Sequence, residues 1–315
     1  MLWLRIPLPM ELNHINVWLL EHGDGWWLVD TGMAEDVCRE AWLQLEEQAL
    51  GGRPLTRIFV THDHPDHMGL APWLAARHGA GVWMSEYAHR SAGKFLDTDP
   101  GVLADRIRGF LHSHGVEVPP GVPPARGDHR EWYGGLPPLA ASPSDGDTIE
   151  AGGGRWQVVE TDGHCRGHLC LYDAARRLLI SGDQVLPSIS PNVSVLSAAP
   201  EADPLREFLA SLQRLGDCHP DTLVLPSHGR PFRGLHRRVA DLTAHHQQQL
   251  EALRAFCTEP RTAFDVLPTM FRRVPRGFHR LLAVGEAVAH LNYLRGRGQV
   301  VRSVDPGGVV RFVAA

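Results

Sequence analysis

The chain has 315 residues, of which 43% are apolar, so it can bury a substantial core in one large domain plus a smaller one. Its net charge of −5 argues against a uniformly basic nucleic-acid binder, and five cysteines without a C-x-x-C pair argue against a disulfide scaffold. No apolar run reaches the roughly 18 residues of a membrane span, and residues 1–10 do not resemble a signal peptide, so we expect a cytoplasmic protein without membrane contact.

The first elements predict a sheet with helices packed on it. Alternating or continuous apolar runs indicate strands, and apolar residues at helical spacing between them indicate helices. This order of strands and helices is typical of an α/β fold. The predicted strands cover residues 2–9, 16–21, 25–30, 55–61 and 81–85, and the predicted helices cover residues 35–50 and 68–78.

A cluster of ligand-type side chains follows the fourth predicted strand. His62, His64, Asp66 and His67 have the spacing H-x-H-x-D-H. An extended backbone points His62 and His64 to the same side, and the proline after them bends the chain, so that Asp66 and His67 face a second point. Neutral imidazoles and carboxylates are preferred ligands of zinc and similar ions. The alternative is a polar surface loop, but five ligand-type residues in six positions favour a metal site.

Residues 86–140 interrupt the strand pattern. Helices are predicted over residues 88–96 and 102–114, and a stretch rich in proline and glycine follows at residues 118–138. An insertion beside a metal loop commonly forms a wall of the substrate pocket, and a surface excursion without a role is the alternative.

Three later strands each end in a ligand-type residue beside glycine. These residues are His164, Asp183 and His228. Each one alone would be ordinary turn chemistry, but three in order after H-x-H-x-D-H support the metal site. Asp30, which ends the third strand, either supports this site or caps the next helix. The later predicted strands cover residues 147–150, 156–161, 168–173, 177–181 and 221–226, with a helix over residues 204–215.

Together these residues resemble the metallo-β-lactamase-fold hydrolase superfamily, whose five motifs begin here with Asp30. The resemblance covers about residues 1–240 and implies a four-layer αβ/βα sandwich with a dinuclear site at one edge of its two sheets. It also implies two divalent metal ions, zinc first, with iron or manganese as alternatives. By this resemblance the first ion is held by His62, His64 and His164, the second by Asp66, His67 and His228, and both by the bridging Asp183.

The second motif departs from the family pattern. Asp162 replaces a common proline, and Cys165 and Arg166 stand where small polar residues and proline are frequent. Cys165 is interpreted as a small buried filler, with a soft ligand or an oxidation-prone thiol as alternatives. His168 is interpreted as a support for the ligands, because seven ligands already complete the set.

Residues 241–315 are predicted to form a small winged-helix-like domain, separate from a catalytic domain at residues 1–240. Its predicted order is three helices and a hairpin, which resembles the C-terminal domain of a lactamase-like subgroup that includes endoribonucleases. Residues 251–315 hold ten arginines and five acids, without a dense basic run. A packing or dimerisation module is therefore favoured over nucleic-acid binding, and a homo-oligomer is compatible with the sequence. The predicted helices cover residues 237–256, 262–271 and 281–295, and the hairpin strands cover residues 299–303 and 309–313.

The predicted activity is hydrolysis of a small-molecule ester or thioester by a metal-bridged hydroxide, with Asp66 and Asp183 orienting it and accepting its proton. A single-strand endoribonuclease that uses the same metals and the basic C-terminal domain is the alternative. A non-catalytic binding module is disfavoured because all seven ligands are present. Lys94 is the only lysine, so the glutathione-binding lysines of glyoxalase II have no counterpart here.

Overall fold

The computed structural model describes residues 1–119 and 129–315. The chain forms two compact units, each of which is described by itself. The first unit consists of Met1–Asp97, His129–Pro191 and Arg214–Arg238, and the second unit consists of Thr98–Asp128, Asn192–Gln213 and Val239–Ala315.

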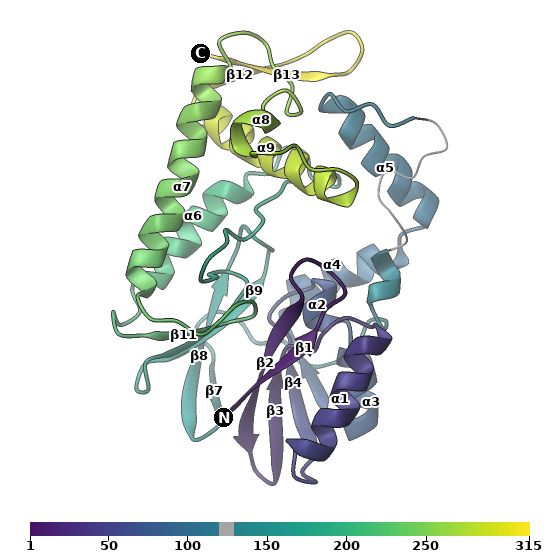
Figure 1. Cartoon of the computed structure of the whole chain (residues 1–315), viewed down its shortest axis with the longest axis vertical. Coiled ribbons are helices and arrows are strands. Elements are labelled where there is room, and N and C mark those ends of the chain that lie inside the picture. The colour runs from purple at the N-terminus through teal and green to yellow at the C-terminus, as the bar shows by residue number, and fades with distance from the viewer. Residues whose placement is uncertain (120–128) are drawn as a thin grey trace. The chain divides into compact units, whose positions relative to one another are not determined.

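The first sheet of the first unit has the strand order β1-β2-β3-β4-β5-β6. Figure 1 labels the first four of these strands. β1, β2 and β3 run antiparallel, whereas β3 to β6 run parallel. β3 reads G-W-W-L-V and is buried on both faces, as is typical of a strand covered from both sides. The strands are β1 (Leu2–Pro7), β2 (His14–His22), β3 (Gly25–Val29), β4 (Leu55–Phe59), β5 (Gly81–Trp83) and β6 (Leu139–Ala141).

The outer face of this sheet packs against α1 (Asp36–Gln48) and α3 (Ala71–His78). Trp42 of α1 and Leu74 of α3 are fully buried in one apolar cluster with Ile58 of β4. Trp42 also donates its indole N–H to the carbonyl of Thr31 at 2.7 Å, which ties α1 to the loop after β3.

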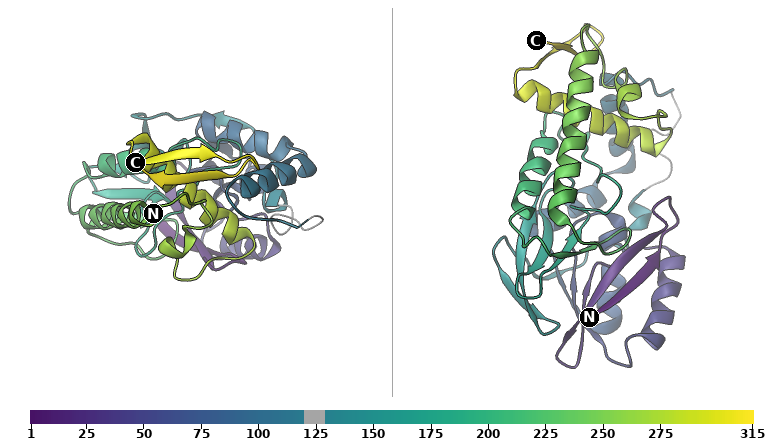
Figure 2. Two further views of the ribbon diagram at one scale, coloured as in Figure 1. Left: turned by 90° about the horizontal axis from the view of Figure 1, so that it is seen from above. Right: turned by 60° about the vertical axis from the view of Figure 1, so that its left-hand side comes forward.

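The second sheet has the order β11-β10-β9-β8-β7 and faces the inner side of the first sheet (Figure 2). Trp156 and Leu171 from this sheet form a common core with Trp27 and Phe59 from the first. The predicted α/β sandwich is therefore confirmed. The strands are β7 (Thr148–Ala151), β8 (Gly154–Thr161), β9 (His168–Asp173), β10 (Leu178–Gly182) and β11 (Leu223–Pro226).

The predicted start of the helix at residues 68–78 is wrong. α2 (Pro65–Met68) begins three residues earlier, and the chain breaks before α3. Proline suits the first helical position because it has no N–H to leave unpaired. At the break, a Cβ on Gly69 would lie 2.3 Å from the Pro65 carbonyl oxygen and 2.6 Å from that of Trp132, so the backbone packs closely there.

The inserted region contains α4 (Glu86–Asp97) and a 3-10 turn, η1 (His129–Trp132), in the first unit. α5 (Pro100–Ser113) belongs to the second unit. The middle of the predicted proline- and glycine-rich stretch, residues 120–128, lies outside the described residues.

The second unit is built around α9 (Phe278–Gly296), in which every residue from 283 to 294 is buried. The predicted helix at residues 262–271 is wrong in length, because only α8 (Leu267–Met270) is helical. The Asp265 carboxylate instead accepts the backbone N–H of Thr262 at 2.8 Å, and the Thr262 hydroxyl accepts that of Asp265 at 3.1 Å. These two hydrogen bonds hold the segment in a turn. The remaining elements are α6 (Pro204–Leu215) and α7 (Leu235–Phe256), which both continue into the first unit, and the hairpin of β12 (Val300–Val304) and β13 (Val310–Ala314).

Among the described residues, no helix combines the length and apolar character that crossing a membrane requires. The order of long helix, short helix, long helix and hairpin agrees with the predicted order. The winged-helix assignment and the boundary at residue 240 stay predictions.

Candidate metal centre

All seven predicted ligands lie together at one edge of the first unit. The loop after β4 carries His62 and His64, and α2 carries Asp66 and His67. The loops after β8, β10 and β11 bring in the remaining three, which are His164, Asp183 and His228. Strand ends hold such side chains well because the sheet fixes the backbone from which they extend.

Three imidazoles form the first cluster. One ring nitrogen of each of His62, His64 and His164 lies within 4.8 Å of the others. His62 Nε2 and His64 Nδ1 are 3.0 Å apart. The side chain of His62 is fully buried, so its ring is held by protein on all sides.

Asp66, His67 and His228 form the second cluster, and their ligand atoms also lie within 4.8 Å of one another. Asp66 Oδ2 is 3.3 Å from His228 Nε2 and 3.6 Å from His67 Nε2. One carboxylate oxygen and two imidazole nitrogens are a donor set that zinc, iron and manganese accept.

Asp183 lies between the two clusters. Its Oδ2 is 3.7 Å from His164 Nε2, whereas its Oδ1 is 3.6 Å from His67 Nε2 and 3.4 Å from His228 Nε2. Each oxygen of this single carboxylate therefore faces a different cluster.

Several polar atoms at this edge have unused bonding capacity. Within the described residues, His67 Nε2, His228 Nε2 and Asp183 Oδ1 are shielded from solvent and accept or donate no hydrogen bond. A buried unsatisfied polar group costs about 1–3 kcal/mol. Divalent cations would satisfy all three atoms, so the residues present fit divalent metal binding.

The electrostatics of the centre also favour cations. Burial alone would raise the pKa of the Asp66 carboxyl, but His67 and His228 hold it at about 2. Burial alone would lower the pKa of His228, but Asp183 and Asp66 raise it to about 10. Protons on imidazoles thus balance the carboxylates, and bound metal ions would displace those protons.

Asp30 supports His67 from behind. Its Oδ2 is 2.8 Å from His67 Nδ1, and its Oδ1 accepts the backbone N–H of Thr61 at 2.8 Å. A carboxylate at Nδ1 leaves Nε2 free for a metal. The alternative role as a helix cap is wrong, because the N-cap of α1 is Glu35. Asp30 has φ = +60°, a left-handed conformation that is uncommon for a residue other than glycine.

His228 and His168 are fixed in the same way. His228 Nδ1 donates to the carbonyl of His14 at 2.8 Å, so that Nε2 faces the second cluster. His168 Nε2 accepts the backbone N–H of Asp183 at 3.2 Å, so His168 positions a ligand. A Cβ at Gly182, which has φ = +52°, would lie 2.3 Å from that nitrogen, so glycine is required there.

Sequence reasoning missed a small network beside the metal loop. Tyr133, from the inserted region, donates its hydroxyl to the backbone carbonyl of Asp63 at 3.0 Å. Cys165 Sγ lies 2.6 Å from Asp63 Oδ1. Burial and the Asp63 carboxylate raise the pKa of the Cys165 thiol well above its usual value, so the thiol keeps its proton. Cys165 is therefore a hydrogen-bond donor that fixes the loop, and the interpretation as a mere filler is wrong. Tyr133 belongs to no recognisable sequence motif. It reaches the metal loop only because of the path that the folded chain takes.

Profiles of two families match the chain. That of the metallo-beta-lactamase superfamily matches residues 10–228, and that of the metallo-beta-lactamase-like C-terminal domain matches residues 250–315. The acyl-coenzyme A thioesterase MBLAC2 of Gallus gallus is 28% identical over 239 residues, which cover 73% of this chain and 78% of that protein. A hydroxyacylglutathione hydrolase of Fuscovulum blasticum is 26% identical over 222 residues, which cover 70% of this chain and 67% of that enzyme.

Two crystal structures are similar over nearly the whole chain. A beta-lactamase domain protein from Burkholderia ambifaria has a TM-score of 0.89 and 38% identity, covering 99% of this chain and 91% of its own. A metallo-beta-lactamase family protein from Thermus thermophilus has a TM-score of 0.83 and 32% identity, covering 100% of this chain and 98% of its own. With its sandwich fold and its clustered histidines and aspartates, the chain belongs to the metallo-beta-lactamase superfamily.

Proposed function

We propose that the protein is a dinuclear metal-dependent hydrolase whose substrate is an acyl thioester of a small thiol carrier. The observation that carries the two-metal proposal is the position of Asp183, whose two oxygens face different clusters 3.4–3.7 Å away. We assign His62, His64 and His164 to the first ion, Asp66, His67 and His228 to the second, and Asp183 to both. Zinc is the metal that we expect, because the donor set is rich in imidazole.

Divalent ions at these clusters would supply Lewis acidity, which polarises a scissile carbonyl and lowers the pKa of water. The protein's own part is to orient that water through the carboxylates of Asp66 and Asp183. Without metal, both carboxyls have a pKa below the usual value, because His67 and His228 outweigh the effect of burial. Divalent cations in place of the imidazole protons would likewise keep both carboxylates ionised as acceptors. The water oxygen bonds to the carbonyl carbon, the C–S bond breaks, and the water's proton passes by way of a carboxylate to the departing thiolate.

The thioester class rests on the relatives. An acyl-coenzyme A thioesterase and a hydroxyacylglutathione hydrolase both cleave a thioester, although their carriers differ. The site of this chain needs no serine or cysteine nucleophile for that reaction, and the Cys165 thiol is held protonated by burial and Asp63, which raise its pKa.

The experiment is a paired hydrolysis screen with zinc-reconstituted and metal-stripped protein. Each acyl group is offered as a coenzyme A thioester, a glutathione thioester and an oxygen ester, next to a lactone, a phosphodiester and single-stranded RNA. We expect metal-dependent turnover of thioesters first. Preferred cleavage of the phosphodiester or of RNA would contradict the proposal.

The second unit gives less support to the endoribonuclease alternative. Several of its arginines are engaged in ion pairs: Arg295 and Arg302 both pair with Glu201, and Arg311 pairs with Asp305. Binding to phosphates must weaken by about 10³–10⁵ between 50 and 200 mM salt for six to ten contacts. We expect only weak RNA binding at physiological salt. Tight binding that is lost when Arg272, Arg273 and Arg280 are replaced by alanine would favour the ribonuclease.

A further inference from the structure

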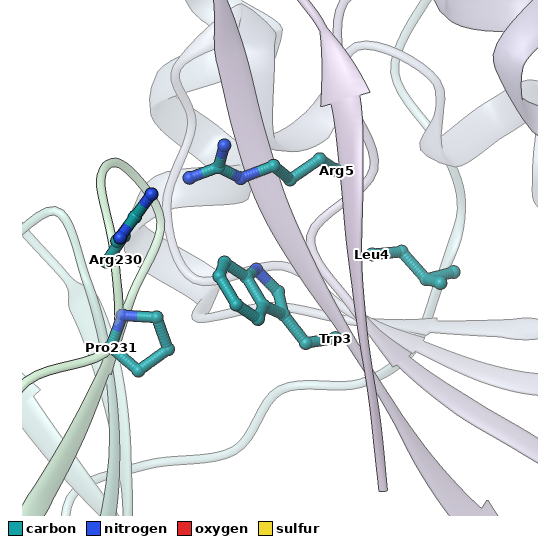
Figure 3. A pocket seen from close by; sticks show the side chains of 5 residues that line it. All are labelled: Trp3, Leu4, Arg5, Arg230 and Pro231. Carbon is teal, nitrogen blue, oxygen red and sulfur yellow. The ribbon is translucent and has the colours of Figure 1, made fainter.

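A surface hollow that no part of the metal centre uses lies beside the β11 loop of the first unit (Figure 3). We call it the N-terminal hollow, and its volume is about 690 Å³. Cavities of about 300–1,000 Å³ typically accommodate small organic ligands. The hollow is lined by Trp3, Leu4 and Arg5 of β1 and by Arg230 and Pro231 of the loop after β11.

The aromatic wall of the hollow is held rigidly. Trp3 exposes 43% of its surface. Its ring stacks on Trp18 of β2 with centroids 6.0 Å apart and an interplanar angle of 17°, and its Nε1 donates to Asn16 Oδ1 at 2.9 Å. An exposed indole with a fixed orientation is a suitable stacking surface for a flat base.

The two arginines give the hollow a positive charge. Within residues 1–119 and 129–315, neither Arg5 nor Arg230 forms an ion pair with a carboxylate. Arg5 donates to the carbonyl of Gly229 at 3.2 Å, and its guanidinium lies 5.2 Å from the centroid of the Trp3 ring. In Figure 3 the Arg5 and Arg230 side chains approach each other from the two walls. Two guanidinium groups beside an aromatic surface suit the phosphates of a nucleotide.

The hollow is connected to the metal centre through the backbone. Gly229, whose carbonyl accepts from Arg5, directly follows the predicted ligand His228. Asn16 Nδ2 donates to the same carbonyl at 2.9 Å, and the carbonyl of His14 accepts from His228. His14 pairs with Pro7, and Pro7 is four residues from Trp3, which is about 13 Å along the strand.

We infer that the N-terminal hollow binds the phosphorylated adenosine end of a coenzyme A thioester, whose pantetheine arm then runs along β1 to the metal centre. This inference rests on the proposed thioesterase function and adds the carrier. The adenine stacks on Trp3, and Arg5 and Arg230 bind the phosphates. Glutathione, the other carrier among the relatives, has carboxylates but no flat base that could stack on the indole of Trp3.

The first test measures binding without turnover. Adenosine 3′,5′-bisphosphate is titrated calorimetrically into the wild-type protein, Arg230→Ala and the control Arg237→Ala, an exposed arginine outside the hollow. We expect saturable binding that weakens about tenfold in Arg230→Ala only, as for the loss of one charge-assisted contact. Trp3→Ala should weaken it too, with partial recovery in Trp3→Phe. The absence of binding by the wild type, or equally tight binding of inorganic pyrophosphate, would overturn the inference.

The second test compares one acyl group on coenzyme A and on N-acetylcysteamine, which lacks the nucleotide. We expect Arg230→Ala to raise KM about tenfold for the coenzyme A thioester, with kcat unchanged and with no effect on the short thioester. An unchanged KM for the coenzyme A thioester, or an equal KM rise for the N-acetylcysteamine thioester, would overturn the assignment of the nucleotide. If the wild type cleaves no thioester at all, the proposed function fails, whereas the calorimetric titration still decides whether the hollow binds a nucleotide.

Discussion

Replacing Asp183 by asparagine tests the two-metal centre most directly. The change keeps the size of the side chain but removes the negative charge that faces both clusters. The asparagine side chain could offer only one oxygen, whereas the native carboxylate has one at 3.7 Å from His164 and another at 3.4 Å from His228. We therefore expect weaker binding of both ions and not of one alone.

The size of the effect follows from His228. Despite burial, Asp183 and Asp66 raise the pKa of His228 from 6.5 to about 10. Asp183 is the main carboxylate behind this rise. Removing one partner of a buried charge pair costs about 3–5 kcal/mol, so we expect a loss of roughly a hundredfold or more in affinity for a cation.

The assay is equilibrium dialysis against a series of zinc buffers, followed by elemental analysis of metal per chain. The matched control is Asp63→Asn, since Asp63 lies on the same loop but bonds Cys165 through its carboxylate. We expect the wild type and Asp63→Asn to retain close to two ions per chain at low free zinc. Asp183→Asn should need a much higher free zinc concentration to keep both ions bound. Unchanged zinc retention by Asp183→Asn, or an equal loss in the control, would refute the reasoning.

Four further outcomes are expected. Asp30→Ala should weaken zinc binding about 10–100-fold in chelator competition, because it frees the His67 ring. His168→Ala should cost activity by about the same factor, and far less than Asp183→Ala in steady-state assays; equal losses would contradict the ligand assignment. Removal of zinc by a chelator should lower the melting temperature, and zinc should restore it. Burial raises the pKa of Glu286 to about 7 from 4.5, so the folded state keeps a proton that the unfolded chain releases, and stability falls as pH rises through this window. Glu286→Gln should remove that fall and be more stable by roughly 3 kcal/mol above pH 7 in denaturant titrations; an unchanged slope between pH 5 and 7 would disprove it.

Local sequence determined much of the fold. Alternating or continuous apolar runs predicted each of the strands β1–β5 and β7–β13 within a few residues, because side-chain direction in a strand follows directly from its period of two. The sequence did not predict β6, because a strand of three residues is too short to show an alternating pattern. The helix at Thr262 was predicted too long, because a reciprocal bond with Asp265 turns the backbone in a way that apolar spacing does not reveal.

The candidate ligands were recognisable in the sequence because four form the H-x-H-x-D-H pattern after a predicted strand and three stand beside glycine at later strand ends. Their convergence depends on tertiary structure, since β4, β8, β10 and β11 belong to two sheets whose ends meet only after the sandwich closes. Pairing of β3 with β4 within the first sheet joins Asp30 to His67 across 37 positions, and the return of the inserted region brings Tyr133 to the metal loop across 70. The N-terminal hollow likewise needs Arg5 and Arg230, which are 225 positions apart, to stand on facing walls. A sequence pattern reports the period and identity of neighbouring residues, and distant side chains meet only through the packing of the sheets that carry them.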